Sequence, residues 1–125
     1  MTNIAILGFG VVGGGVADVI ATNNETIARK TGEHINIKYI LDKRTFPDHE
    51  LGDRVTTDFE KIVSDPEIVM IVETMGGSHP AYDFTKACLE AGKSVVTSNK
   101  EVVARFGAEL LEIAAKNGVR YLFEA

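Results

Sequence analysis

The feature that most limits what this chain can fold into is a glycine-rich run between a strand-like segment and a helix-like one. Residues 4–7 are continuously apolar, as in a strand buried on both faces of a parallel sheet. The residues that follow match the pattern G-x-G-x-x-G and are Gly8, Phe9, Gly10, Val11, Val12 and Gly13. From about residue 12 to residue 29, apolar residues recur at helical spacing. A dinucleotide-binding loop requires this order of strand, loop and helix, although a turn that holds no ligand has the same local pattern.

Each glycine of this run has a physical role if the loop holds a dinucleotide. Gly8 permits a tight turn, Gly10 lets the backbone approach a pyrophosphate, and Gly13 lets the helix pack closely on the strand. The N-terminus of the helix attracts the anion. We therefore expect a cofactor of the NAD or NADP type at this loop.

Short β-branched runs alternate with longer amphipathic stretches along the chain. We expect strands at residues 4–7, 35–41, 68–72, 94–97 and 119–123, and helical stretches at about residues 12–29, 59–64, 80–91 and 101–117. Residues 45–55 contain proline, glycine and several charges, which predicts a loop. The alternation implies an α/β fold over residues 1–125, with a doubly wound parallel sheet of the Rossmann type. Because the last strand ends the sequence abruptly, we expect a longer protein.

The composition excludes several function classes. The chain has 125 residues, 45% of them hydrophobic and 25% charged, which is ordinary for a folded single domain. Its 13 Lys and Arg against 18 Asp and Glu argue against binding of nucleic acid or of an anionic membrane. Without a spanning apolar run or a signal peptide, the chain is expected to be soluble and cytoplasmic. Cys88, the only cysteine, is predicted to pack in the core.

The end of the second predicted strand carries three charged residues that could select the cofactor. An acidic residue there accepts from the ribose 2′-hydroxyl of NAD, whereas Lys or Arg accommodates the 2′-phosphate of NADP. This chain offers both, as Asp42, Lys43 and Arg44. Asp42 lies 29 residues after Gly13, so the intervening helix or loop is expected to be extended. The two cations favour NADP, dual use stays open, and the alternative is that all three are solvated loop residues.

Two further segments fall at the carboxyl ends of strands, where doubly wound sheets bind their ligands. Gly76 and Gly77 could let the nicotinamide half lie close to the backbone, or could simply form a turn before a helix. Lys100 comes at or near a helix start, where the macrodipole disfavours a cation. That position suggests an anionic partner such as a cofactor or a substrate carboxylate, and the alternative is a solvated lysine offset by Glu101.

Four stretches, spread over the chain in family order, resemble the N-terminal part of homoserine dehydrogenase. They are residues 8–16, 76–82, 91–100 and 117–125. The Thr-Ser-Asn-Lys segment that ends at Lys100 and the closing Phe-Glu-Ala are more specific than the glycine pattern. The resemblance implies an oxidoreductase that interconverts L-homoserine and L-aspartate 4-semialdehyde with NADP or NAD, in threonine and methionine biosynthesis.

The resemblance also implies roles for individual residues. The glycine loop, including Phe9, Val11 and Val12, would contact the cofactor. Lys100 would lie between the nicotinamide and the substrate, bind one or both, and aid proton transfer as a catalytic residue. Glu124 would belong to a sodium site whose other ligands follow residue 125. The full-length enzyme would take a small-molecule substrate and form a homo-oligomer.

The sequence departs from the family in two ways. The family often ends its second strand with Arg-Asp, whereas this chain has Asp-Lys-Arg, so the choice between NADP and NAD stays open. The family's substrate-binding and dimer-forming region, with its catalytic Asp and Lys, is not within these residues, so we expect cofactor binding without turnover. Two alternatives remain open, which are another amino-acid-related Rossmann dehydrogenase and a nucleotide-sensing module without chemistry.

Overall fold

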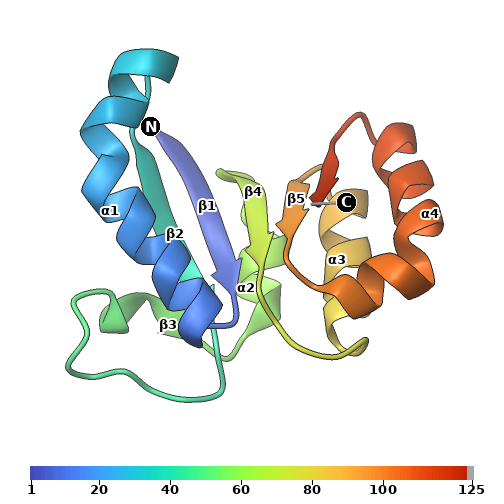
Figure 1. Ribbon diagram of the computed structural model, residues 1–125, viewed down its shortest axis with the longest axis horizontal. Coiled ribbons are helices and arrows are strands. Elements are labelled where there is room, and N and C mark those ends of the chain that lie inside the picture. The colour runs from blue at the N-terminus through green and yellow to red at the C-terminus, as the bar shows by residue number, and fades with distance from the viewer. Residues whose placement is uncertain (124–125) are drawn as a thin grey trace.

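A six-stranded parallel sheet forms the centre of the computed structural model, which describes residues 1–123 (Figure 1). Its strands are β1 (Thr2–Leu7), β2 (Ile35–Leu41), β3 (Val55–Thr56), β4 (Ile68–Glu73), β5 (Ser94–Thr97) and β6 (Tyr121–Phe123). The helices are α1 (Val11–Thr31), α2 (Phe59–Val63), α3 (Ala81–Glu90) and α4 (Lys100–Lys116), with a 3₁₀ turn at η1 (Gly52–Arg54).

The strand order is β3-β2-β1-β4-β5-β6, and every neighbouring pair is parallel. The chain therefore builds outward from β1 to β3, returns to the centre at β4, and builds outward on the other side. Residues at the carboxyl ends of β1 and β4 become neighbours, as in the register pair Leu7 and Glu73. This is the switch-point arrangement of the Rossmann fold, where ligands bind. The predicted fold class is confirmed.

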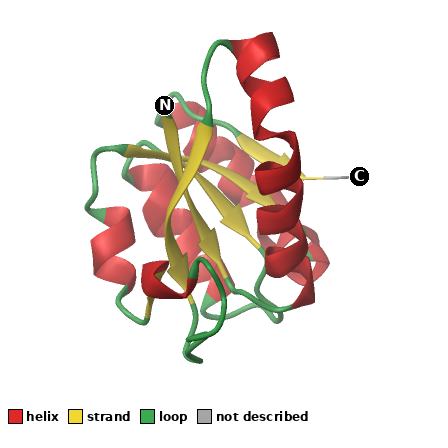
Figure 2. Ribbon diagram, turned by 90° about the vertical axis from the view of Figure 1, so that its left-hand side faces the viewer, coloured by secondary structure: helices red, strands yellow, loops and turns green. Residues whose placement is uncertain are grey.

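Helices cover both faces of the sheet (Figure 2). On one face, α1 packs over β1 and β2, and this core contains Ile4, Ile6, Phe9, Ala17, Ile37 and Ile40. On the other face, α2, α3 and α4 bury a larger core, which includes Ile62, Ile71, Leu89, Val95, Val102 and Leu110. The strand residues alternate between these two cores because successive side chains of a strand point to opposite faces.

Local signals set the ends of the helices. Gly32 ends α1 in the left-handed conformation at φ +87, and its N–H donates to the carbonyl of Ala28. Asp58 begins α2 by accepting from the N–H of Glu60, and Asn99 begins α4 by accepting from the N–H of Val102. The 21-residue length of α1 accounts for the long separation between the glycine loop and Asp42.

Several predicted boundaries differ from the structure: β1 begins at Thr2 rather than at residue 4, β4 extends to Glu73, and two further differences change the description of the sheet. Residues 45–55 are not wholly loop, because they include η1 and the first residue of β3, which pairs with Ile40 of β2. A two-residue edge strand has too few positions to show a period of two. The last strand begins at Tyr121 rather than at residue 119, since the N–H of Val119 is used to close α4 on the carbonyl of Ala114.

Within the residues that the structure describes, no helix is both long and apolar enough to cross a membrane. The same residues hold no group of three or more His, Cys, Asp or Glu side chains arranged to bind a metal ion.

Cys88 is buried in the core as predicted, and that burial raises the pKa of its thiol to about 12. A thiol held neutral in this way is unreactive.

Candidate functional site

The loops that follow β1, β4 and β5 meet at the carboxyl edge of the sheet. Thr74, directly after β4, connects two of them: its N–H donates to the carbonyl of Leu7 at 2.9 Å, and its hydroxyl donates to the carbonyl of Gly8 at 2.9 Å. These bonds hold the glycine loop against the end of β4. At the switch point, hydrogen bonds therefore join two segments that are more than sixty residues apart in the sequence.

The three glycines of the G-x-G-x-x-G fingerprint, Gly8, Gly10 and Gly13, have different structural roles. Gly8 has a φ of +92, a backbone conformation that residues other than glycine rarely adopt. A Cβ on Gly13 would lie 2.1 Å from the carbonyl oxygen of Gly8, so α1 and β1 pack too closely there for any side chain. A Cβ on Gly10 would meet nothing closer than the Arg44 guanidinium at 3.9 Å. The fold requires Gly8 and Gly13, but it leaves open space at Gly10.

Residues beside these glycines fall into two groups. Val11 and Val12 open α1 on the surface, where Val11 is 94% exposed, so both can meet a ligand. The ring of Phe9 turns inward and is 5% exposed, with Phe46 and His49 packed edge-on against it at 5.1 and 4.9 Å between ring centres. Phe9 can thus reach a ligand only through its backbone.

Asp42 follows β2 and is surrounded by donors from the protein itself. One carboxylate oxygen accepts from the N–H of Phe9 at 2.9 Å and from the guanidinium of Arg44 at 3.0 Å. The other accepts from the backbone N–H and the Nε of Arg44, at 2.9 and 3.1 Å. These Arg44 bonds lower the pKa of Asp42 to about 2. A carboxylate offers about four lone-pair positions, so Asp42 has no acceptor to spare for a ribose hydroxyl.

Arg44 and Lys43 remain available at the same edge. The Arg44 side chain is 64% exposed, packs over the ring of Phe46, and reaches the open space beside Gly10. Lys43 is exposed next to it. A hollow of about 300 Å³ lies here at the ends of β2 and β3, lined by Asp42, Arg44, Thr45, Gly52, Val55, Thr56 and Thr57.

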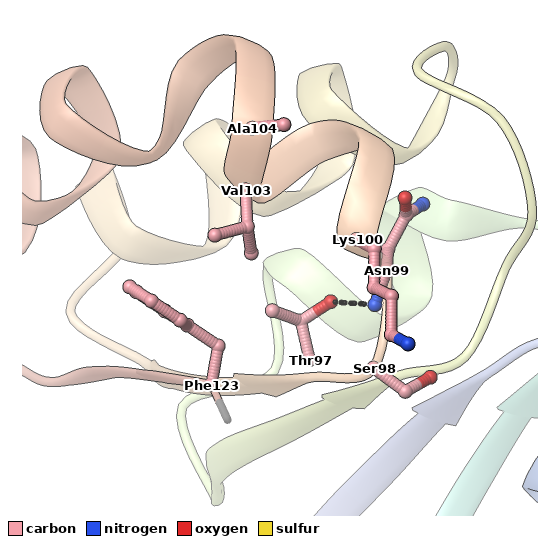
Figure 3. A pocket seen from close by; sticks show the side chains of 7 residues that line it. All are labelled: Thr97, Ser98, Asn99, Lys100, Val103, Ala104 and Phe123. Carbon is pink, nitrogen blue, oxygen red and sulfur yellow. Dashed lines mark hydrogen bonds between the residues drawn. The ribbon is translucent and has the colours of Figure 1, made fainter. Parts of the chain in front are cut away.

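Lys100 lines a second pocket, of about 580 Å³, at the ends of β5 and β6. The lining side chains, drawn in Figure 3, are Thr97, Ser98, Asn99, Lys100, Val103, Ala104 and Phe123. Val103 and Phe123 supply an apolar wall, and Lys100 is exposed as the first residue of α4. Glu101, which could have offset its charge, instead accepts a hydrogen bond from the hydroxyl of Ser78 at 2.9 Å. No ion pair between Lys100 and Glu101 forms in this part of the chain.

The Gly76–Gly77 turn is hydrogen-bonded to Asn99, one of the residues that line this pocket. The side-chain amide of Asn99 donates to the carbonyls of Met75 and Gly77, at 3.0 and 2.8 Å. Gly77 has a φ of +76, and both glycines are exposed. The two segments that the sequence predicted to meet at the carboxyl edge are therefore joined by one asparagine. Glu124, the predicted sodium ligand, lies outside the described residues.

Sequence reasoning missed Glu73, the last residue of β4. It is fully buried, and its carboxyl group accepts from the Thr97 hydroxyl at 2.8 Å and from the Met75 N–H at 2.7 Å. Desolvation by this burial raises the pKa of Glu73. The sequence feature that could have indicated Glu73 is an acidic residue at the end of an otherwise apolar central strand.

Comparisons with known proteins agree with this geometry. Residues 8–124 match the family model for the homoserine dehydrogenase NAD-binding domain. Homoserine dehydrogenase of Pseudomonas aeruginosa is 37% identical over 123 residues, which are 98% of this chain and 28% of that protein. The chain thus spans less than a third of the length of this relative.

Solved structures show the same likeness. The crystal structure of S. aureus homoserine dehydrogenase at pH 6.5 matches with a TM-score of 0.90 and 38% identity, over 99% of this chain and 32% of that one. A hyperthermophilic archaeal homoserine dehydrogenase in complex with NADPH matches with a TM-score of 0.80 and 26% identity, over 98% of this chain and 43% of that one. By its sheet, its glycine loop and these matches, the chain belongs to the homoserine dehydrogenase NAD-binding domain family.

Proposed function

We propose that this chain binds NADP, and NAD more weakly, at the carboxyl edge of its sheet. The cofactor-binding part that it represents would serve an oxidoreductase that interconverts L-homoserine and L-aspartate 4-semialdehyde. The observation that carries the proposal is Gly10, since it alone among the fingerprint glycines has open space where a side chain would stand. The fold does not need a glycine there, whereas a pyrophosphate close to the backbone does.

The glycine loop would hold the pyrophosphate. Gly10 is the N-cap of α1 and provides no side-chain cap, so N–H groups of the first turn are left for a ligand. The first turn also has no acidic residue that would repel an anion. A phosphate there is favoured by the helix dipole and by these donors together.

Arg44 would distinguish the two cofactors. Because Asp42 is saturated by Phe9 and Arg44, it is a poor acceptor for the 2′-hydroxyl of NAD. Arg44 directs one edge of its guanidinium at Asp42, and its other N–H groups can donate to a 2′-phosphate. Lys43 adds a second exposed cation. The archaeal relative solved with NADPH supports this preference.

Lys100 and the turn at Gly76 and Gly77 would receive the nicotinamide end. The bound cofactor supplies or accepts the hydride. The chain contributes a cation at Lys100 that can orient a carboxylate or an amide, and an apolar wall at Val103 and Phe123 that excludes water. The substrate would be a small molecule held partly by Lys100, and the complete enzyme would be a homo-oligomer.

Calorimetric titration of the chain with NADPH and NADH tests the proposal. We expect one site per chain for NADPH and weaker binding of NADH, with an NADPH affinity that falls as salt is added. Glutathione or citrate at the same ionic strength is a control for non-specific anion binding. Absence of saturable binding of either dinucleotide would contradict the proposed function.

A further inference from the structure

Glu73 is hydrogen-bonded both to the segment that lines the pocket of Lys100 and to the start of the Gly76–Gly77 turn. Its carboxyl group accepts from the Thr97 hydroxyl at the end of β5 and from the N–H of Met75 at the start of the Gly76–Gly77 turn. Its backbone carbonyl accepts from the N–H of Ser98 at 3.1 Å. One buried residue at the end of β4 therefore bonds to both segments that the proposed function assigns to the nicotinamide end.

The bonds of Glu73 continue into a closed ring. The hydroxyl of Thr97 accepts from the N–H of Asn99 at 2.9 Å, the contact drawn as a dashed line in Figure 3. Asn99 then donates through its side chain to the carbonyls of Met75 and Gly77. It also caps α4, by accepting from the N–H of Val102 at 3.1 Å. Lys100, the next residue, is attached to this ring through the backbone.

A carboxyl group is energetically unfavourable at a fully buried position. Burial of an acid costs free energy unless hydrogen bonds compensate, and here it raises the pKa of Glu73. An apolar residue would satisfy the core at lower cost, since the neighbouring core residues include Ile71 and Val95. What an apolar residue could not do is accept from the Met75 N–H and the Thr97 hydroxyl, and a satisfied polar network of this kind holds its members in one arrangement.

We propose that Glu73 is a positioning residue for the nicotinamide half of the cofactor, because it keeps the Gly76–Gly77 turn and the Thr97–Lys100 segment at a set separation. This inference rests on the proposed function, since it presumes that the nicotinamide enters beside Lys100. Glu73 acts through Thr97, Met75 and Asn99, and none of the hydrogen bonds of the ring involves Gly10 or Arg44, at the adenosine half of the site.

The test compares two ligands on four variants of the whole chain. NADPH carries the nicotinamide, and 2′-phospho-ADP-ribose is the same molecule without it. Thr97→Val removes the hydroxyl that joins Glu73 to Asn99, Thr97→Ser restores it, and Glu73→Leu removes the carboxyl group at nearly constant volume. Thr85→Val is the matched control, because Thr85 is also buried, on α3, and its hydroxyl has no hydrogen-bond partner within residues 1–123.

We expect Thr97→Val and Glu73→Leu to weaken NADPH binding about 3- to 10-fold, the range of one lost hydrogen bond, and to leave 2′-phospho-ADP-ribose within about twofold. Thr97→Ser and Thr85→Val should match the unmodified chain for both ligands. A general loss of stability would instead weaken both ligands together.

The proposal is overturned if the folded Thr97→Val chain loses affinity for both ligands alike, or for neither. Should Glu73→Leu fail to fold, the contrast between Thr97→Val and Thr97→Ser decides the question by itself. If the unmodified chain binds neither ligand, the proposed function is wrong and the inference is overturned with it, an outcome visible before any variant is made.

Discussion

Asp42 accepts four hydrogen bonds, and three of them come from Arg44, two residues further along the chain. The fourth comes from the N–H of Phe9 in the glycine loop. The acid that the sequence offered as one possible acceptor for the ribose 2′-hydroxyl is thereby occupied within the protein, and it connects the end of β2 to the glycine loop. Asp42 positions Arg44, and Arg44 is left as the charged group that faces solvent.

Neutralising the two cations tests their role in cofactor choice. The double variant Lys43→Ala with Arg44→Ala should lower NADP affinity about 10- to 100-fold, since two charge-assisted contacts to the 2′-phosphate are lost, and should lower NAD affinity less than threefold. Titrations with both cofactors at two salt concentrations measure this. If the unmodified chain binds NAD much more tightly than NADP, the assignment of Arg44 to the 2′-phosphate is wrong.

Stability at low pH tests the saturated carboxylate. The pKa of Asp42 is lowered to about 2 in the folded chain, whereas an aspartate in an unfolded chain titrates near pH 4. Its stabilising effect is therefore fully present above about pH 4 and is lost as the pH falls toward 2. Because the Arg44 partner is exposed, we expect Asp42→Asn to cost about 1–2 kcal/mol at pH 7.

Urea unfolding between pH 7 and pH 3 is the measurement for Asp42. The difference between the unmodified chain and Asp42→Asn should narrow as the pH falls below 4. Asp48→Asn, at an exposed position of the following loop, serves as the matched control and should change stability little at any pH. A difference that stays constant down to pH 3 would assign the effect of Asp42→Asn to packing rather than to charge.

Substitutions at Gly10 and Gly13 should separate binding from folding. Gly13→Ala places a Cβ 2.1 Å from a backbone oxygen and should destabilise the chain by about 2–3 kcal/mol. Gly10→Val meets open space, so the unfolding free energy should fall by only about 1 kcal/mol, the cost of a poorer N-cap residue. NADPH affinity should nevertheless fall more than about tenfold, because the side chain enters the position of the pyrophosphate.

Gly15→Val is the matched control for Gly10→Val. Gly15 is exposed one turn further along α1, and a Cβ there also meets nothing within 4 Å. This variant should keep its NADPH affinity. Unchanged affinity of a folded Gly10→Val chain would remove the main support for the cofactor site.

Lys100 should matter for turnover and not for the fold. Its position as the first residue of α4 is unfavourable for a cation, so Lys100→Ala should leave the unfolding free energy unchanged or raise it by about 0.3–1 kcal/mol. In a chain extended by the region that its longer relatives possess, the same change should lower kcat/KM about 100-fold or more. Absorbance of NADPH in the presence of homoserine measures this.

The 125-residue chain itself should bind cofactor and show no turnover of homoserine. Hydride transfer needs a substrate held close to the nicotinamide and a proton acceptor in reach of its hydroxyl. Lys100 is the only candidate that the proposal supplies for either task. Robust turnover by this chain would show that it already contains the catalytic groups. Normal activity of the extended enzyme with Lys100→Ala would show that Lys100 has no catalytic role.

The sequence by itself determined those parts of the molecule that depend on near neighbours along the chain. Apolar runs predicted the central strands of the sheet. Gly32 and Asp58 likewise set helix ends through their own backbone and side-chain chemistry. The glycine fingerprint predicted the turn from β1 into α1, because Gly8 and Gly13 are separated by only a few residues and meet in that turn.

Only the tertiary structure decided which polar groups satisfy one another. Phe9 and Asp42 are 33 residues apart, and Glu73 and Thr97 are 24 apart, yet parallel pairing of the strands brings each pair within hydrogen-bond distance. Such contacts leave no periodic signal in the sequence, and the same is true of the two-residue strand β3. A buried donor or acceptor needs a partner wherever the sheet places one, and for this reason Asp42 accepts from Phe9 and Glu73 accepts from Thr97.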